Sequence, residues 1–131
     1  MKVFEPLPAR TETLAKQTVD AAMKVHRALG PGLLESVYEK CLIHELRRRK
    51  IAVQAQVNVP VVYEGLRLES GLRLDLLIDQ QLIVEIKAVE EMSRLFKAQV
   101  LTYLRLTNLR LALLINFNVP LLRDGIHRVI L

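Results

Sequence analysis

Residues 72–88 read LRLDLLIDQQLIVEIKA, and this stretch decides the fold. Two apolar runs of strand length flank the short polar connection Asp79-Gln80-Gln81, which is typical of an antiparallel hairpin. Asp75 interrupts the first run, and Glu85 and Lys87 interrupt the second. Strand alternation projects Glu85 and Lys87 from one face, and pairing across the connection brings Asp75 close to Glu85. The stretch therefore predicts two carboxylates and a lysine that converge on one point of a sheet.

The sequence before this hairpin predicts one more strand of the same sheet. Residues 52–62 alternate with a period of two and are rich in β-branched side chains, and Pro60 favours an edge position or a bulge. Glu64-Gly65 is a turn, and the strand that follows, residues 66–78, is expected to be interrupted near Gly71. Residues 52–88 thus form a three-stranded antiparallel meander.

Helical periodicity surrounds the meander on both sides. We expect helices over residues 11–29, 32–49 and 92–106, and strands over residues 111–117 and 125–131. In the second helix, the residues expected to face inward are Leu34, Val37, Tyr38, Cys41, Leu42 and Leu46. The third helix connects two strands, 82–88 and 111–117, which are therefore expected to be parallel. The fold class is α/β or α+β, a mixed sheet covered by helices.

Composition narrows the class of protein. A chain of 131 residues with 51% hydrophobic and 25% charged residues is expected to form one globular domain over residues 1–131. Its longest uncharged stretch has 13 residues, whereas a membrane span needs about 20, and residues 1–12 do not resemble a signal peptide. We expect a cytoplasmic protein without a membrane partner. A single cysteine cannot form an intramolecular disulfide, and with three scattered histidines it does not make a Cys/His zinc site. The net charge of +5 is compatible with a polyanionic binding partner and equally with an ordinary soluble surface.

Asp75, Glu85 and Lys87 together suit metal chemistry on a phosphate. Mg²⁺ prefers oxygen ligands and is typically held by one or two carboxylates together with substrate oxygens. A metal at Asp75 and Glu85 would activate water, and Lys87 would orient that water or stabilise the added negative charge. The alternative is a buried ion pair between Lys87 and either carboxylate, without catalysis.

Three further polar residues are candidates for the same site. Glu35 shares a helical face with Tyr38, although it could instead complement the positive end of its helix. Gln99 and Tyr103 are four residues apart in the third helix, where Gln99 could contact a phosphate or cap the sheet edge. The basic run Arg47-Arg48-Arg49-Lys50 could form a phosphate patch or complement the negative end of its helix.

These motifs together resemble the GxxExxY protein family, a branch of the PD-(D/E)xK nuclease superfamily, over residues 14–131. Gly32, Glu35 and Tyr38 match the signature from which the family takes its name. The motifs that carry the resemblance are VHRALGPGLLESVYEKCL, RLDLLIDQQLIVEIKAVE, AQVLTYLRLTNLRLALLINF and GIHRVIL, in this order. The proline expected before the motif aspartate is absent, because Leu74 occupies that position.

The resemblance implies a restriction-endonuclease-like core over about residues 32–117: helix, three antiparallel strands, helix and parallel strand. An N-terminal helix and a C-terminal edge strand are additional. It also implies divalent metal at Asp75, Glu85 and the Ile86 carbonyl with help from Glu35, while Lys87 is catalytic and Gln99 and Tyr103 form a QxxxY motif.

Two functions follow as hypotheses. The first is an endonuclease or exonuclease that uses Mg²⁺ or Mn²⁺ to hydrolyse nucleic acid, most readily DNA, through a metal-activated water. The second is a catalytically silent nuclease-fold module that binds nucleic acid or a protein partner, as a homodimer. The chain has three Phe, three Tyr and no Trp, so it lacks an aromatic platform for bases, and weak sequence specificity is expected.

Overall fold

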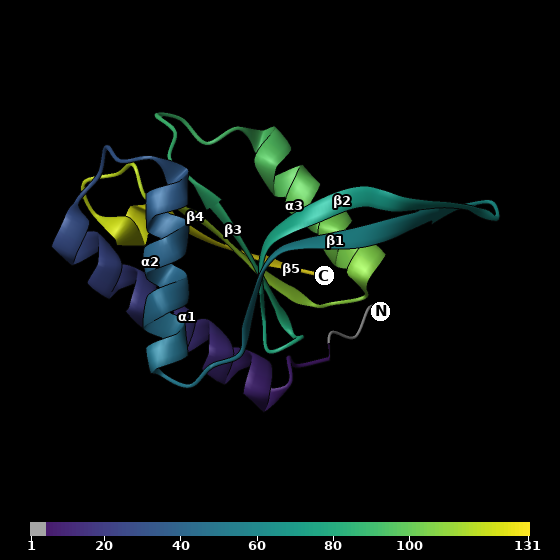
Figure 1. Cartoon of the computed structure of the whole chain (residues 1–131), viewed down its shortest axis with the longest axis horizontal. Helices are drawn as coiled ribbons and strands as arrows, with labels where there is room; N and C mark the ends of the chain where they lie inside the picture. The colour runs from purple at the N-terminus through teal and green to yellow at the C-terminus, as the bar shows by residue number, and fades with distance from the viewer. Residues whose placement is uncertain (1–4) are drawn as a thin grey trace.

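The computed structural model describes residues 5–131 as a five-stranded mixed sheet with three α-helices (Figure 1). The predicted α/β class and the order of the elements are confirmed. The first four residues of the predicted domain lie outside the described part. The elements are α1 (Ala9–Leu29), α2 (Glu35–Arg48), β1 (Val53–Tyr63), β2 (Leu66–Ile78), β3 (Leu82–Lys87), α3 (Arg94–Thr107), β4 (Leu111–Asn116), the short 3₁₀ helix η1 (Leu122–Gly125) and β5 (Ile126–Ile130).

The sheet has the strand order β1-β2-β3-β4-β5. The first three strands are antiparallel neighbours, so the predicted meander is confirmed. β3 and β4 are parallel and are connected through α3, as expected, and β5 closes the other edge antiparallel to β4. In the hairpin between β2 and β3, Ile78 pairs with Leu82, and Asp79 and Gln80 adopt positive φ angles of 47° and 60°.

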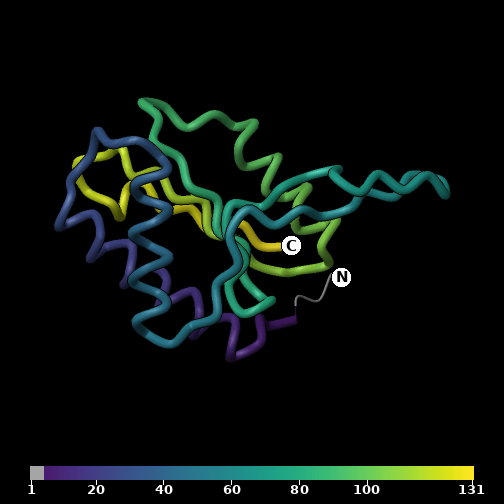
Figure 2. The backbone as a smooth tube through the Cα atoms, viewed as in Figure 1, coloured from purple at the N-terminus to yellow at the C-terminus, as the bar shows by residue number. Residues whose placement is uncertain are grey.

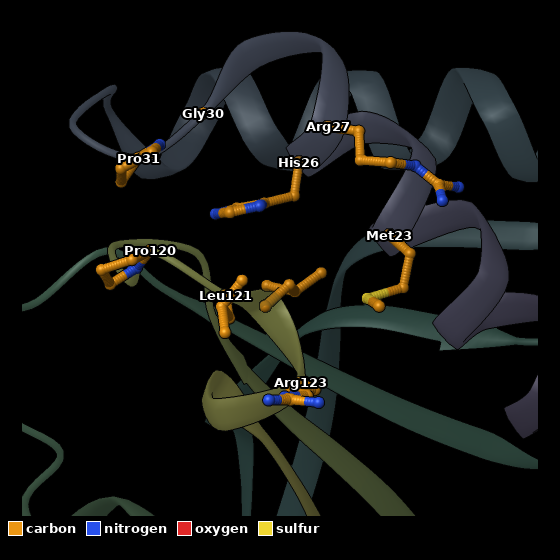
Figure 3. A pocket seen from close by; sticks show the side chains of 9 residues that line it. Met23, His26, Arg27, Gly30, Pro31, Pro120, Leu121 and Arg123 are labelled. Atoms are coloured by element: carbon orange, nitrogen blue, oxygen red, sulfur yellow. The ribbon is translucent and has the colours of Figure 1, made fainter.

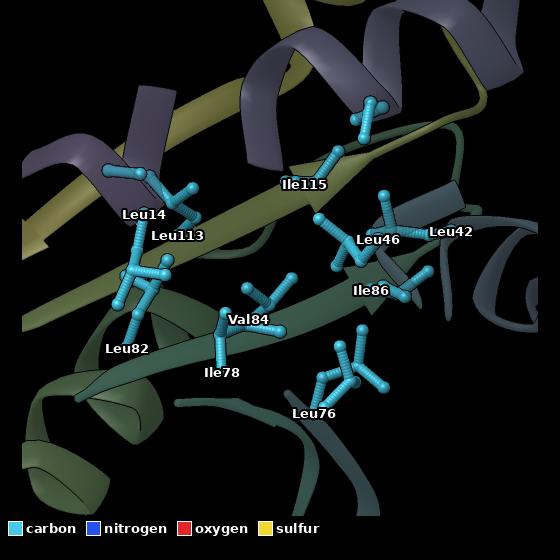
Figure 4. Close-up of a cluster of buried hydrophobic side chains, with 14 of the residues drawn as sticks. Leu14, Leu42, Leu46, Leu76, Ile78, Leu82, Val84, Ile86, Leu113 and Ile115 are labelled. Atoms are coloured by element: carbon cyan, nitrogen blue, oxygen red, sulfur yellow. The ribbon is translucent and has the colours of Figure 1, made fainter. Parts of the chain in front are cut away.

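The sheet is covered on both faces, which explains why β4 and the first three residues of β3 are almost wholly apolar. On one face, side chains from β3 and β4 pack beneath α1 and α2, and Figure 4 shows this cluster, which includes Leu14, Leu42, Leu46, Leu82, Val84, Ile86, Leu113 and Ile115. On the other face, Ile83 packs with Val100 and Leu104 of α3. Because side chains alternate along a strand, Glu85 and Lys87 share the α3 face with Ile83.

α2 starts three residues later than predicted, at Glu35 rather than at residue 32. Gly30 and Gly32 have φ angles of 71° and 98°, which favour glycine and break the helical path. Leu34 therefore lies in extended backbone before the helix, and its side chain is 74% exposed. The prediction that Leu34 faces inward is wrong.

β1 and β2 form a hairpin that extends well beyond the helices, and we call its outer part, residues 59–72, the arm (Figure 2). The register of the two strands shifts between Val59 and Val61, so the edge position and bulge predicted from Pro60 are both confirmed. β2 itself runs unbroken through Gly71, so the predicted interruption of the strand there is wrong. Gly71 instead lies between Leu68 and Leu72, the stretch across which the register with β1 shifts.

The alternation of β1 reverses at Gln56, where φ is 53°. Val53 packs in the cluster under α1 and α2, whereas Val57 and Val59 pack on the α3 side. The simple alternation seen in the sequence would place Val53, Val57 and Val59 on one face of the sheet, and the structure places them on two faces.

No helix between residues 5 and 131 has the length and the apolar character that are needed to cross a membrane.

Candidate functional site

The structure brings Asp75 and Glu85 together at the point where β2 and β3 separate. The regular pairing ends at Leu76 and Val84, and Asp75 and Glu85 are the next two residues. The backbone N–H of Asp75 donates to Glu85 Oε1 at 3.1 Å, and the backbone N–H of Ile86 donates to Asp75 Oδ2 at 2.9 Å. Each carboxylate thus replaces a carbonyl as the acceptor for the opposite strand.

Negative charge on this pair is costly. Glu85 is only 6% exposed, and burial, followed by the charge of Asp75 and a hydrogen bond with Asp75, raises the pKa of Glu85 to about 9. At neutral pH Glu85 is therefore protonated in the absence of another cation. A nearby divalent cation would favour the ionised form of Glu85.

The donor atoms of the pair fit a hard divalent cation. One oxygen of each carboxylate accepts a backbone N–H, and in residues 5–131 no backbone group donates to Asp75 Oδ1 or Glu85 Oε2. Two carboxylate oxygens are a usual protein contribution to a Mg²⁺ site, in which water and substrate supply the rest. No group of three or more His, Cys, Asp or Glu side chains that could hold a metal forms in the described chain.

Lys87 extends from the same face of β3 but does not neutralise the pair. Its Nζ lies 4.4 Å from the ring centroid of Phe96 in α3, which is a cation–π contact. Among the described ion pairs with N···O distances up to 4.0 Å, none joins Lys87 to Asp75 or Glu85. The alternative of a structural ion pair is therefore not what the structure shows. Phe96 could not be identified from the sequence, because its contact with Lys87 depends on how α3 packs.

Tyr103 also faces the two carboxyl groups, from α3. It is half-buried, and its pKa is raised first by burial and then by the charges of Glu85 and Asp75. The phenol is therefore neutral at ordinary pH and can donate a hydrogen bond. Gln99 lies one helical turn earlier and is exposed, and no hydrogen bond connects it to the carboxylates within the described residues.

Glu35 reaches the neighbourhood of the site from the other face of the sheet. It is exposed at the start of α2 and, with Ser36, lines a surface hollow that also includes Ala88, the residue after Lys87. Glu35 does not join Asp75 and Glu85 in a cluster of three acids within the part of the chain described.

Tyr38 fixes the loop that precedes Glu35. Its hydroxyl donates to the Gly30 carbonyl at 2.6 Å and accepts from the Leu33 N–H at 3.1 Å. The ring is fully buried and stacks on Phe117, with centroids 4.6 Å apart. The sequence indicated that Tyr38 faces inward, and the structure adds that it holds both ends of a glycine-containing loop.

Asn116, which was not identified from the sequence, holds the segment that follows Lys87. It pairs with Lys87 across the parallel strands and is 2% exposed. Its Nδ2 donates to the Val89 carbonyl at 2.9 Å, and its Oδ1 accepts from the N–H groups of Val89 and Asn118, both at 3.1 Å. The signal was available, because Asn116 is the polar residue in the apolar run LALLINF.

The basic end of α2 is largely occupied by contacts within the protein. Arg49 donates to Gln17 Oε1 at 2.9 Å and lies 3.5 Å from Glu45, while Arg47 donates to the Val53 carbonyl at 3.3 Å. Glu45, at 8% exposure, is another buried acid that the periodicity did not reveal. These contacts favour a structural role for this run over a phosphate patch.

A cavity elsewhere on the molecule does not involve the carboxylates. It lies between α1, the loop after it and the segment at Pro120, with Met23, Arg27 and Arg123 around it (Figure 3). His26 lies beside it and is bound through Nε2 to the Val119 carbonyl at 2.8 Å, as befits a core histidine.

Comparison with known proteins agrees with this geometry. The profile that describes the PD-(D/E)XK nuclease superfamily matches residues 12–129, which include every residue of the site. No curated protein matches the chain closely enough to count as a relative. Because the matched region covers nearly all of the sequence, the chain belongs to the PD-(D/E)XK nuclease superfamily.

Proposed function

We propose that this protein is a nuclease that uses Mg²⁺ or Mn²⁺ to hydrolyse phosphodiester bonds, most readily those of DNA. The observation that carries the proposal is the pairing of Asp75 with Glu85, with Lys87 on the same face as Glu85. Nucleases of the superfamily generally use divalent metals. We also propose that the chain is a GxxExxY member of the superfamily and acts as one cytoplasmic domain.

The residues divide the chemistry among them. Asp75 and Glu85 would hold the cation, together with the Ile86 carbonyl, while Glu35, at the hollow beside Ala88, would assist from the other face of the sheet. A divalent cation bound there supplies a Lewis acid that lowers the pKa of water and neutralises charge on the phosphate. In the overall reaction, water adds to phosphorus and one P–O ester bond breaks, which leaves a phosphate monoester and a hydroxyl group.

Lys87 and Tyr103 are suited to stabilise the extra negative charge that develops on the phosphate during hydrolysis. The Lys87 ammonium has no carboxylate partner in the described residues and is oriented by Phe96, so its charge is available to the phosphate. Tyr103 remains protonated because burial raises its pKa, and it can donate to a phosphate oxygen. Gln99, exposed one turn earlier, would contact the nucleic-acid backbone.

A cleavage assay with matched variants tests the proposal. Plasmid, single-stranded DNA and RNA are incubated with Mg²⁺, with Mn²⁺ and with EDTA. Wild-type protein is expected to cut in metal only, and Asp75→Asn, Glu85→Gln and Lys87→Ala are expected to lose at least about a hundredfold of the rate. Asp20→Asn, an exposed change on α1 with the same charge difference as Asp75→Asn, should cut like wild type.

The outcome that contradicts the proposal is wild-type cleavage no faster than that of Glu85→Gln in either metal. A second candidate function would then stand: a catalytically silent module that binds nucleic acid or a protein partner. The two backbone hydrogen bonds favour that alternative, because they give Asp75 and Glu85 a structural role that needs no metal. Binding of labelled DNA without cleavage, unaffected by EDTA, would support it.

A further inference from the structure

His127 of β5 lies in the same row of the sheet as Glu85. Leu114 of β4 pairs with Glu85 on one side and with His127 on the other. Residues paired across neighbouring strands point to the same face, so His127 projects, as Glu85 does, from the face that α3 covers. Two strand spacings, about 9.6 Å, separate the two residues. His127 is thus a near neighbour of the candidate site on the same face of the sheet.

Lys97 of α3 lies close to His127. α3 connects the parallel strands β3 and β4 and runs back along them, and β5 is antiparallel to β4, so α3 and β5 run in the same direction. Val100 of α3 and Val129 of β5 belong to one apolar cluster. Lys97 precedes Val100 by about 4.5 Å of helix, and His127 precedes Val129 by about 6.6 Å of strand. Both side chains therefore lie at the end of the sheet where β3 and β4 finish.

The electrostatics of His127 agree with this placement. Burial, followed by the positive charge of Lys97, lowers the pKa of His127. The imidazole is therefore neutral at pH 7 and above and offers an N–H, while Lys97 is exposed and supplies a positive charge. Among the ion pairs of residues 5–131, none includes Lys97 or His127. Both groups are thus available to an anion from outside the described chain.

We propose that Lys97 and His127 together bind a second phosphate of the nucleic-acid strand, near the phosphate that is cut at Asp75 and Glu85. This inference rests on the proposed nuclease function. Phosphate oxygens accept from an ammonium and from an imidazole N–H, and lysine contacts to phosphate supply much of the affinity of proteins for nucleic acid. A strand that is held at two points is oriented across the site, which lowers the entropic cost of reaching the reactive geometry.

The basic run at the end of α2 is less suitable for this contact. Arg47 and Arg49 already donate to groups within the protein. Arg48 lies at the far end of a 14-residue helix, about 20 Å along its axis from Glu35. The row that contains Glu85 and His127 offers the shorter path for a strand that enters the candidate site.

Substrate length separates the second phosphate from the first. A dinucleotide has a single phosphodiester, so only a longer substrate such as a tetranucleotide can occupy both contacts. In Mg²⁺, wild type is expected to gain at least about tenfold in kcat/KM from the dinucleotide to the tetranucleotide, because binding energy from a remote group is used at the reacting one. Lys97→Ala should lose most of this gain and should cut the dinucleotide as wild type does. The matched control is Lys16→Ala, which removes an exposed lysine of α1 on the opposite face of the sheet and should retain the gain.

The salt dependence of binding gives a second readout, which needs no cleavage. In a Glu85→Gln background at pH 8, fluorescence anisotropy measures the Kd of a labelled single strand of about 20 nucleotides at several NaCl concentrations. Lys97→Ala should raise Kd at least about fivefold and reduce the slope of log K against log[NaCl] by about 0.7, the value for one phosphate contact with a single strand. His127→Gln should raise Kd about threefold and leave the slope unchanged, because the imidazole is neutral. His44→Gln, at an exposed position of α2, should bind like the parent.

Two results would overturn the second phosphate contact while leaving the proposed function intact. One is wild-type cleavage with the same gain from substrate length in Lys97→Ala as in wild type. The other is an equal Kd and an equal salt slope for Lys97→Ala and Lys16→Ala. A wild-type protein that never cuts, but whose salt slope depends on Lys97, would contradict the proposed nuclease and retain the contact. A protein that binds no nucleic acid overturns both.

Discussion

Asp75 and Glu85 each accept a backbone N–H from the strand that carries the other, at 2.9 and 3.1 Å. The pair therefore joins the two strands just beyond the point where their regular pairing ends, and it also places two carboxyl groups side by side. An amide at either position keeps an oxygen acceptor but removes the charge, whereas alanine removes both. Amide variants consequently separate the electrostatic role of this pair from its structural role.

The raised pKa of Glu85 predicts that the metal-free protein loses stability as pH rises. The folded-state pKa is about 9 and the usual value is 4.5, so the folded protein holds an additional proton between these two values. This contribution is complete below pH 4.5 and is lost as pH rises through 9, at about 1 kcal/mol per pH unit. Urea unfolding in EDTA between pH 6 and 9 measures the slope. Glu85→Gln should lack it, and identical slopes in both proteins would contradict the assignment.

Divalent metal should reverse this loss of stability. A cation that binds only the folded state raises the free energy of unfolding by about 2.7 kcal/mol at a hundredfold excess over its Kd. Because the cation competes with the proton on Glu85, the rise in Tm on adding Mg²⁺ or Mn²⁺ should be larger at pH 8 than at pH 6. Thermal unfolding should show no such rise for Asp75→Asn or Glu85→Gln, while Asp20→Asn should behave like wild type. An equal response in all four proteins would show that the metal binds elsewhere.

The part of the site on β2 and β3 could be predicted from the sequence because it depends on local rules. Strand alternation fixes the face that Glu85 and Lys87 share, and the short connection fixes the residue opposite Glu85. Polar or charged residues in an apolar strand are the signal, and Asn116 in LALLINF carries it as well as Glu85 and Lys87 do.

Other features depend on contacts or backbone angles that periodicity does not reveal. The positive φ angles of Gly30 and Gly32 end the helical path, which is why Leu34 lies outside α2. The positive φ angle of Gln56 likewise reverses the side-chain alternation of β1. Phe96 became recognisable only once α3 was placed over Lys87, since helical spacing cannot say which side chain of another element it meets.

Tyr38→Phe should destabilise the protein without opening its core. The ring and its stacking on Phe117 are retained, but the Gly30 carbonyl loses its donor and the Leu33 N–H loses its acceptor. We expect a loss of about 1–3 kcal/mol in the free energy of unfolding. Faster amide exchange at Leu33 should accompany this loss. A decrease below about 0.5 kcal/mol would mean that water replaces the hydroxyl at little cost.

Phe96→Leu tests whether the aromatic ring positions the Lys87 ammonium. Leucine keeps an apolar side chain at this half-buried position but removes the π face that lies 4.4 Å from Nζ. A cation–π contact of about 0.5–1 kcal/mol corresponds to a two- to fivefold fall in kcat of the proposed nuclease, with KM little changed. Phe96→Tyr, which keeps the ring, should restore the rate. Equal rates for the leucine and tyrosine variants would argue against a positioning role.

Asn116→Leu should release the segment that follows Lys87. The Asn116 side chain makes three hydrogen bonds, two to Val89 and one to Asn118, and leucine of similar volume makes none. Because the site is buried, the cost is expected to be about 2–4 kcal/mol in the free energy of unfolding. Asn118→Ala is the matched control, since Asn118 takes part through its backbone N–H, and it should cost under about 1 kcal/mol. Chemical unfolding and amide exchange at Val89 measure both effects. If the exchange of Val89 stayed slow in Asn116→Leu, the segment would be held by other contacts, and Asn116 would have no part in placing Lys87.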